Sequence, residues 1–157
     1  MSETFNAIIA SPLGLLGLRV SDTVDGIEFL SASIDVMGAQ TALAAEAVAQ
    51  MNAYFQKLDY QFDLPLAENQ TTFQGRVRQA MQAIPCGETR TYGEVAGNIG
   101  SGARAVGNAC RHNPLPVVVP CHRIVSATGL GGYAGETAGD MMGRKRWLLQ
   151  HEGVQLD

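Results

Sequence analysis

The sequence predicts an α/β unit followed by a mainly α-helical unit, and three observations lead to this fold class. Residues 5–30 read as short strands separated by turn signals. Apolar residues at helical spacing replace that pattern over residues 39–58 and return after residue 70. Between them, residues 59–70 are polar, contain Pro65 and show no clear period. We therefore expect an N-terminal domain with its linker at residues 1–69 and a C-terminal domain at residues 70–157.

The N-terminal domain should be an antiparallel meander covered by one helix. The strands are expected at Phe5–Ala10, Leu13–Val20 and Val24–Leu30, with a turn signal at residues 11–14. The helix is expected from about Ala39 to Leu58, and its apolar face would pack on the sheet. The members of that face are Ala44, Ala47, Val48, Met51, Phe55 and Leu58.

The C-terminal domain begins with a helix that ends at Pro85-Cys86-Gly87. A second, short helix is expected from Tyr92 to about Asn98, because Thr91 and Glu94 fit a capping box. The apolar face of the first helix consists of Phe73, Val77, Ala80, Met81 and Ile84.

The short helix and the one after it are a helix-turn-helix candidate, because a glycine-containing turn joins them. Ser101 would cap the later helix, which spans Ala103–His112 and stops at Asn113-Pro114. Small side chains dominate residues 102–110, and Arg104 is the one large cation among them. Such a helix can approach DNA closely, but the same pattern fits an ordinary helix hairpin that binds no DNA.

Charge is distributed unevenly between the two halves. Residues 1–69 hold two basic residues against nine acidic ones, a balance of −7, whereas the remainder carries +3 and the whole chain −4. This asymmetry suggests an anionic partner for the basic half, although a mild excess is also common on solvated surfaces. Apolar runs such as residues 114–120 are too short to span a membrane, so we expect a soluble, cytoplasmic protein without a membrane partner.

One proline-rich segment marks the candidate reactive residue. A β-rich run, Val117–Val119, would deliver Cys121 onto a proline-bounded turn, and His122 and Arg123 follow it directly. A thiol with a pKa near ~8.5 reacts as the thiolate, so a neighbouring base or cation can turn it into a nucleophile. The three cysteines form no C-x-x-C pair, which predicts reduced thiols. The alternative is that Cys121 only packs as a small hydrophobe.

Five motifs occur in order along the C-terminal half, namely Ala103–Gly107, Asn113–Pro116, Pro120–Val125, Gly132–Gly135 and Trp147–Gly153. Together they resemble the O6-alkylguanine-DNA alkyltransferase (methylated-DNA–protein-cysteine methyltransferase) family, and the resemblance covers about residues 73–153. It implies a C-terminal helix-turn-helix domain of the winged-helix-like type. It also implies an N-terminal α/β domain similar to ribonuclease H.

The resemblance implies an activity as well. Members of the family repair DNA by a direct, stoichiometric and irreversible transfer of the alkyl group from O6-alkylguanine, and from O4-alkylthymine, to one of their own cysteines. Here the acceptor would be Cys121, and each protein molecule would react once. The implied partner is double-stranded DNA that contains O6-alkylguanine, bound by a monomer without metal or cofactor.

By resemblance, four residues would carry the chemistry. Cys121 would be the acceptor thiol, and His122 would keep it ionised through a bridging water. Glu152 would orient the imidazole, which is the logic of a catalytic triad in a thiol version. Tyr92 would donate a proton to the departing guanine.

Five further residues would bind DNA or the flipped base. Arg104 would replace the extruded nucleotide in the base stack, and Asn113 would tie the recognition helix to the active-site strand. Tyr133 would line the nucleobase pocket, with backbone groups near Ala134 and Gly135 contacting the base. Two features depart from the family pattern: Ala134 stands where some members have Ser, and the loop at residues 135–142 is longer.

Three other interpretations compete with this one. A zinc site of Cys110, His112, Cys121 and His122 is disfavoured, because a rigid proline-rich strand splits the ligands and their spacing matches no known finger. A non-catalytic lesion binder of the same fold would lack the acceptor thiol. A helix-turn-helix regulator with a thiol sensor would normally need an effector domain or a dimer interface, and nothing in residues 1–69 resembles either.

Overall fold

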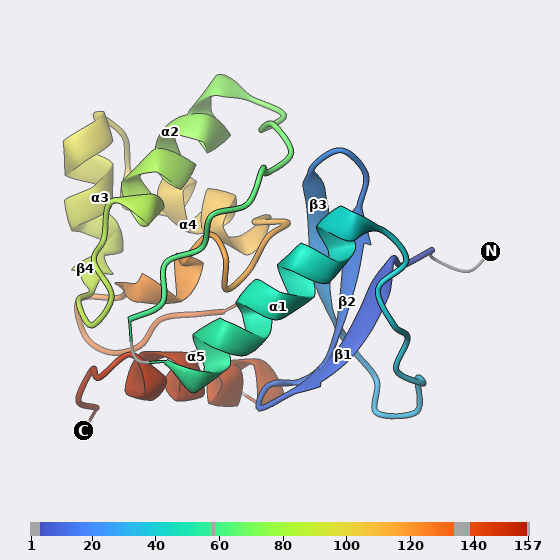
Figure 1. Ribbon diagram of the computed structural model, residues 1–157. Coiled ribbons are helices and arrows are strands. Elements are labelled where there is room, and N and C mark those ends of the chain that lie inside the picture. Colours follow the sequence, from blue (N-terminus) through green and yellow to red (C-terminus); the bar gives the residue numbers. More distant parts are fainter. Residues whose placement is uncertain (1–3, 58, 134–138, 157) are drawn as a thin grey trace. The chain divides into compact units, whose positions relative to one another are not determined.

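The computed structural model describes residues 4–57, 59–133 and 139–156, and the chain divides into two compact units (Figure 1). The first is Met1–Ala67 and the second is Glu68–Asp157. A β-meander and a helix make up the first unit, whereas helices dominate the second. The predicted order of fold classes, α/β first and mainly α-helical second, is confirmed.

Three antiparallel strands form the sheet of the first unit: β1 (Ala7–Ser11), β2 (Gly14–Val20) and β3 (Val24–Leu30), in the order β1-β2-β3. The turn between β1 and β2 is closed by the Ser11 hydroxyl, which donates to the Gly14 carbonyl over 2.7 Å. Gly14 has φ 97°, a left-handed conformation that favours glycine. The predicted meander is confirmed, because each strand boundary lies close to its expected position.

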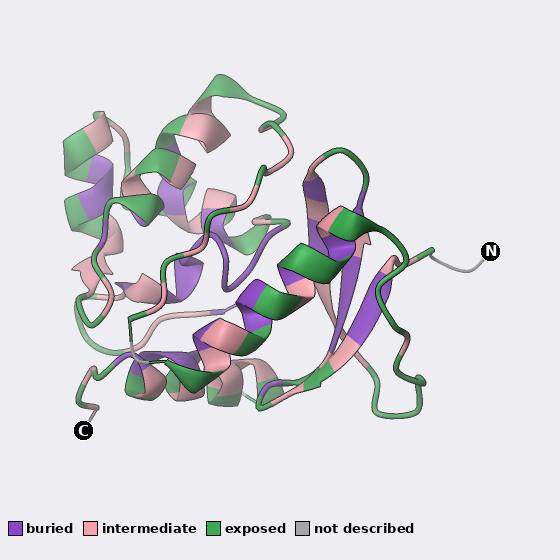
Figure 2. Ribbon diagram, in the orientation of Figure 1, coloured by how far each residue is buried: buried purple, intermediate pink, exposed green. Residues whose placement is uncertain are grey.

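Helix α1 (Ala42–Gln56) packs on that sheet and contacts all three strands (Figure 1). The Thr41 hydroxyl caps its first turn by accepting from the Ala44 amide over 3.1 Å. This cap explains why the helix begins after the predicted Ala39. Buried residues recur along one face of the helix (Figure 2), namely Ala44, Ala47, Gln50, Met51 and Tyr54.

Residues 59–67, which the sequence predicts to be part of a linker, are tied to the first unit. The Gln50 side chain donates to the Asp63 carbonyl over 2.9 Å and accepts from the Asp63 amide over 2.8 Å. Val24 of β3 forms a parallel bridge with Leu66. The segment therefore pairs with the sheet and with α1 before the second unit begins.

The second unit holds four α-helices, one 3-10 turn and two very short strands among its described residues. They are α2 (Thr72–Gln82), β4 (Arg90–Thr91), α3 (Tyr92–Ile99), α4 (Ala103–Arg111), η1 (Cys121–Arg123), β5 (Ile124–Val125) and α5 (Asp140–His151). Strands β4 and β5 pair in parallel, so the start of α3 lies beside the residues that follow η1. The core of the unit includes Val77, Val106, Leu115, Ile124, Leu148 and Leu149.

Helices α3 and α4 form the predicted helix-turn-helix pair and contact one another. The predicted capping box is present: the Thr91 hydroxyl accepts from the Glu94 amide over 3.0 Å, and the Glu94 carboxylate accepts from the Thr91 amide over 2.7 Å. The prediction that Ser101 caps α4 is wrong. Gly100 ends α3 in a left-handed conformation, and the Ser101 amide then donates back into the last turn of α3 over 2.8 Å. Ser101 therefore closes α3, and Gly102 becomes the N-cap of α4.

The prediction of a β-rich run at Val117–Val119 is also wrong, because this buried segment forms a turn. The Val119 amide donates to the Leu115 carbonyl over 2.9 Å, and Val117 has φ 75°, which is unusual for a β-branched residue. Prolines at positions 114, 116 and 120 lack the amide hydrogen that a strand ladder needs. Cys121 therefore follows a buried turn, not a strand.

Candidate active site

One turn of 3-10 helix, η1, presents three adjacent side chains that can carry chemistry. The Arg123 amide closes this turn by donating to the Pro120 carbonyl over 3.0 Å. A 3-10 helix has about three residues per turn, so the side chains of Cys121, His122 and Arg123 point in different directions. Cys121 is 6% exposed and His122 is fully buried. Residues that are neighbours in sequence thus have different partners in the fold.

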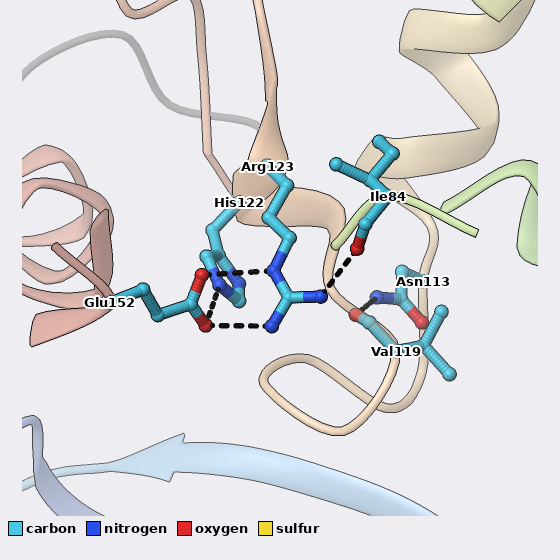
Figure 3. A network of polar contacts seen from close by, with 6 residues as sticks. All are labelled: Ile84, Asn113, Val119, His122, Arg123 and Glu152. Carbon is cyan, nitrogen blue, oxygen red and sulfur yellow. Dashed lines mark hydrogen bonds and ion pairs between the residues drawn. The ribbon is translucent and has the colours of Figure 1, made fainter. Parts of the chain in front are cut away.

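The imidazole of His122 is held by a buried carboxylate. Its Nε2 lies 2.8 Å from Oε2 of Glu152, the residue directly after α5, and both side chains are fully buried (Figure 3). An ionised carboxylate only accepts hydrogen bonds, so Nε2 carries the hydrogen and Nδ1 carries the lone pair. Nδ1 is buried and has no hydrogen-bond partner within the described part of the chain. Burial lowers the pKa of His122 more than Glu152 raises it, so the imidazole is neutral at neutral pH.

Arg123 binds the same carboxylate. Its Nε donates to Oε1 of Glu152 over 2.8 Å and its Nη2 donates to Oε2 over 3.0 Å, while Nη1 donates to the Ile84 carbonyl over 2.7 Å (Figure 3). The sequence suggests Arg123 as a cation for the thiol, but the structure pairs it with Glu152. The positive charge that acts on the thiol is that of Lys145.

The Cys121 thiol lies in a buried setting that opposes its ionisation. Burial raises its pKa, whereas a hydrogen bond with the Asn113 side chain and the charge of Lys145 lower it, and burial dominates. Asn113 also braces the buried turn: its Nδ2 donates to the Val119 carbonyl over 2.9 Å (Figure 3). Its Oδ1 accepts from the Leu115 amide over 3.0 Å. Asn113 thus links the end of α4 to the turn that carries the thiol. A base must act on Cys121 for it to react at neutral pH.

Lys145 of α5 is a site residue that the sequence analysis does not single out. Its side chain is fully buried, and its Nζ donates to the carbonyls of Ile124 and Gly132 over 2.7 and 2.9 Å. Nζ also lies 5.9 Å from the centroid of the Tyr92 ring. Burial lowers the pKa of Lys145 to about 8, while the charges of the nearby thiols raise it. A signal exists in the sequence, because Lys145 precedes two core leucines of α5 by three and four residues and so lies on its apolar face.

Two tyrosines interact electrostatically with the thiol. Burial, and then the charges of Cys110 and Cys121, raise the pKa of Tyr92 to about 12. Burial, followed by the charge of Cys121, raises the pKa of Tyr133 well above its ordinary value. Both phenols therefore keep their protons at neutral pH. Tyr92 packs closely on Gly131, where an added Cβ atom would lie 2.9 Å from the Tyr92 ring.

Residues 72–154 match a family model described as 6-O-methylguanine DNA methyltransferase, DNA binding domain. This match covers more than half of the chain and includes the site described above. The chain belongs to this methyltransferase family. The family resemblance that the ordered motifs predict is thus confirmed.

Individual relatives agree with this assignment. The methylated-DNA–protein-cysteine methyltransferase of Mycobacterium tuberculosis is 50% identical over 109 residues, which cover 68% of this chain and 63% of that protein. The protein of the same name from Methanosarcina acetivorans is 47% identical over 111 residues, 69% of this chain and 68% of that protein. The match therefore extends over less than two thirds of the mycobacterial methyltransferase.

Solved structures of methyltransferases share the fold. The crystal structure of Mycobacterium tuberculosis O6-methylguanine methyltransferase has a TM-score of 0.76 and 37% identity, and covers 95% of this chain and 93% of its own. A crystal structure of Mycobacterium tuberculosis OGT in complex with DNA has a TM-score of 0.75 and 40% identity, and covers 92% and 90%. The aligned residues cover more than nine tenths of this chain and therefore include both units. Both units share their fold class with these proteins.

The remaining residues that the methyltransferase family implies lie in different places. Arg104 is exposed on α4, whereas Tyr133 is buried. Ala134 and Gly135 lie outside the described residues, as do residues 136–138 of the longer loop.

The structure thus brings three of the residues that are expected to be catalytic into one region of the second unit. The Cys121 thiol, the His122 imidazole and the Glu152 carboxylate come from η1 and the end of α5. Tyr92 lies at the start of α3, and a negative charge on Cys121 raises the pKa of its phenol. Arg104 stands apart from them on an exposed face of α4.

The described residues, 4–57, 59–133 and 139–156, hold neither a metal-ligand cluster nor a membrane-spanning helix. Within these ranges, no group of three or more His, Cys, Asp or Glu residues is placed to hold a metal ion. Cys110, a ligand in the zinc interpretation, is buried with its sulfur 4.0 Å from that of Met81. No helix in the same ranges has the length and apolar character needed to cross a bilayer.

Proposed function

We propose that the protein repairs alkylated DNA by transferring the alkyl group from O6-alkylguanine in duplex DNA to Cys121. O4-alkylthymine is a second substrate of the same reaction. The observation that carries the proposal is a buried thiol whose next residue, His122, is a neutral imidazole with Nε2 held by Glu152 at 2.8 Å and with Nδ1 lacking a hydrogen-bond partner among the described residues. Membership of the methyltransferase family supports it. The names of the relatives, methylated-DNA–protein-cysteine methyltransferases, describe this chemistry.

Thiol activation is the first step. The Cys121 proton passes through a bridging water to Nδ1 of His122, which has the lone pair to receive it. Glu152 accepts the hydrogen bond from Nε2 and stabilises the imidazolium that forms. Because burial raises the pKa of Cys121, this base is needed at neutral pH.

Alkyl transfer follows. The thiolate sulfur attacks the alkyl carbon, a carbon–sulfur bond forms, and the carbon–oxygen bond breaks with its electron pair moving onto the guanine. Tyr92 donates a proton to the departing base, a role consistent with a pKa of about 12 that keeps the phenol protonated. The imidazolium of His122 supplies the proton that balances the one lost by Tyr92. The product is a thioether without a carbonyl for water to attack, so each molecule reacts once.

DNA binding uses the helix-turn-helix pair α3–α4. A base inside a duplex can reach Cys121 only when it is flipped out, which costs a few kcal/mol and less for a poorly paired lesion. Exposed Arg104 fills the gap that the base leaves. Tyr133 lines the base pocket, with the backbone at Ala134 and Gly135 contacting the base. The protein acts as a monomer, and its reduced thiols suit the cytoplasm.

Mass spectrometry of the intact protein tests the proposal. After incubation with an O6-methylguanine duplex, we expect one added methylene unit per molecule, mapped to Cys121. Cys110→Ala and Cys86→Ala are matched controls that should still react. Cys121→Ala should lose transfer and retain DNA binding, because the DNA-binding helices lie elsewhere in the second unit. An adduct on Cys86 or Cys110, or repeated turnover, would show the mechanism to be wrong.

A further inference from the structure

The Arg123–Glu152 pair is not used by the transfer steps described above. Oε1 of the carboxylate accepts from Arg123 at 2.8 Å, and Oε2 accepts from Arg123 at 3.0 Å and from His122 at 2.8 Å (Figure 3). The Arg123 side chain is 12% exposed and that of Glu152 is fully buried. A buried bidentate pair of this kind is geometrically specific, and removing one partner leaves the other charge uncompensated. Arg123 therefore contacts both oxygens of the carboxylate, including the one that accepts from His122.

Both members of the pair are fixed from outside as well. Nη1 of Arg123 donates to the carbonyl of Ile84, just beyond the end of α2, over 2.7 Å. Gly87, in the following turn with φ 88°, approaches the Glu152 backbone so closely that an added Cβ would lie 3.1 Å from its carbonyl oxygen. The Arg123 guanidinium is thus anchored to a residue that follows α2, and the Glu152 backbone lies against the turn after it.

The charged groups that face His122 come from η1 and α5. Glu152 raises the pKa of His122, whereas Arg123 and Lys145 lower it. The Tyr133 phenol and the neighbouring thiol are uncharged at neutral pH, because burial raises both pKa values. Arg123 and Glu152 together are neutral. The carboxylate can therefore accept from Nε2 without drawing a second proton onto the imidazole.

We propose that Arg123 is a positioning residue: it locks Glu152 as an ionised acceptor for Nε2 of His122 and so leaves Nδ1 unprotonated and able to take the thiol proton. The proposal rests on the proposed function, in which His122 is the base. Without the guanidinium, the buried carboxylate would retain His122 as its charged partner. The imidazole would then hold both protons at a higher pH than in the wild-type protein, and Nδ1 could no longer act as a base.

Nitrogen-edited NMR of the imidazoles tests this protonation state directly. The chain has three histidines, so His112→Gln and His151→Gln assign the His122 signals. In the wild-type protein we expect the neutral form, protonated on Nε2, to persist below the ordinary histidine pKa of about 6.5. In Arg123→Gln, which keeps a hydrogen-bond donor and removes the charge, we expect the pKa of His122 to rise.

The alkylation rate of Cys121 should follow the same titration. Two reactions are compared across neutral pH: modification by iodoacetamide, located by peptide mass mapping, and transfer from an O6-methylguanine duplex. For each unit by which Arg123→Gln raises the pKa of His122, the alkylation rate at pH values below that pKa should fall about tenfold. The rate should recover toward the alkaline plateau, because the base is deprotonated there.

Two further variants separate charge, geometry and general effects. Arg123→Lys keeps the charge but loses the two-pronged contact, so we expect a pKa of His122 close to the wild-type value and a severalfold lower plateau rate. Arg90→Met is the control, since it removes an exposed pair in which Arg90 lies 3.0 Å from Glu88. It should leave the rate and its pH profile unchanged.

A uniform loss of rate at every pH in Arg123→Gln, with the pKa of His122 unchanged, would overturn the proposal and leave Arg123 a structural role. If Arg123→Gln does not fold, Arg123→Lys tests the proposal instead. A wild-type rate of Arg123→Lys at every pH would show that the two-pronged contact is dispensable and would overturn the proposal. Failure of the proposed function looks different. The wild-type protein would then accept no alkyl group from DNA. The titration of the His122 imidazole and the pH profile of iodoacetamide modification would still test whether Arg123 positions Glu152.

Discussion

Two side chains offset part of the effect that burial has on the Cys121 thiol. Burial raises its pKa, and Asn113 and Lys145 oppose that rise through a hydrogen bond and a positive charge. Lys145 is itself fully buried, with a pKa lowered to about 8. The cation that favours the thiolate is therefore close to losing its own proton near neutral pH, which couples the two groups.

Lys145→Met should separate reactivity from stability. Lowering the pKa of Lys145 from 10.5 to about 8 reduces the free energy of unfolding by roughly 3 kcal/mol at neutral pH. Replacing the lysine with methionine removes this destabilisation. It also leaves two buried carbonyls without a donor, at about 1–3 kcal/mol each. The two effects nearly cancel, so we expect a small change in urea unfolding and a clear loss in the rate of alkyl transfer at neutral pH. An unchanged rate would show that the charge of Lys145 does not act on the thiol.

The stability of the protein should pass through a maximum near pH 9. Between the folded pKa of Lys145, about 8, and its ordinary 10.5, the unfolded chain binds more protons, so the free energy of unfolding rises with pH. Burial raises the pKa of Cys110 from 9.0 to about 12 and also raises the pKa of Cys121. Above pH 9 the folded chain therefore binds more protons at two thiols, and stability falls by up to about 1.4 kcal/mol per pH unit for each.

Urea unfolding across this range would measure the maximum. Lys145→Met should lose the rise below pH 9 and keep the fall above it. A steady fall from pH 8 upward in the wild-type protein would contradict the lowered pKa of Lys145.

Arg104→Ala should separate base flipping from chemistry. We expect it to weaken repair of duplex DNA far more than reaction with free O6-benzylguanine, because the free base needs no extrusion. Arg104 is exposed on α4, so its loss should leave the fold and the buried site intact. The two rates are measured on the same preparation. Equal losses on both substrates would refute the role of Arg104 in the base stack.

The sequence predicts well those helices and strands that are specified by residues close together in the chain. The strands of the meander follow from short apolar runs between turn residues, and α3 follows from Thr91 and Glu94, three residues apart. The flanking prolines argue against a strand at Val117, but the left-handed turn itself is not visible in the sequence, because the Asn113 side chain that bonds at both ends of the segment is revealed only by the fold. β-branched residues alone favour a strand there.

The candidate site also combines residues that sequence motifs indicate with residues that only the fold reveals. Motifs around Cys121 and Glu152 indicate a family, and their residues lie together in the structure. The pairing of Arg123 with Glu152 joins residues 29 positions apart, so spacing gives no sign of it. Lys145 shows in the sequence only as a lysine on an apolar helix face, and its role appears once Ile124 and Gly132 supply the carbonyls around it.

The capping box at the start of α3 offers a test at the scale of one helix. Thr91→Ala should lower the free energy of unfolding by about 1 kcal/mol, because the Glu94 amide loses its acceptor. Ser101→Ala is a matched control: its hydroxyl does not cap α4, so its effect should stay within about 0.5 kcal/mol. Both are measured by urea unfolding. An equal loss in the two variants would contradict the assignment of the caps.

On the scale of the whole molecule, the two halves of the sequence carry opposite charge. Residues 1–69 have a balance of −7 and the remainder +3. The segment that matches the family model, residues 72–154, lies in the basic part. We therefore expect attraction to DNA phosphates to come from local positive side chains of the second unit and to be sensitive to salt, since the net charge of −4 repels DNA at long range.

The stability of the whole molecule should report on whether it has reacted. Cys121 is 6% exposed and follows a fully packed turn, so an added alkyl group must displace buried atoms. Overpacking usually costs about 1–3 kcal/mol. Alkylation also makes the sulfur a weaker acceptor for the Asn113 side chain, an effect of the same sign. We therefore expect a lower Tm for the alkylated protein, by about 2–4 °C for each kcal/mol, and a larger drop for benzyl than for methyl.

Thermal unfolding of unmodified, methylated and benzylated samples would decide this. Cys121→Ala treated with the same alkyl donors is the control, and its Tm should not change. The order of the midpoints carries the argument, because a benzyl group has more atoms to accommodate than a methyl group in the same buried place. Equal or higher midpoints for the adducts would mean that the pocket beside Cys121 has room for the alkyl group, and that packing does not distinguish the reacted protein from the unreacted one.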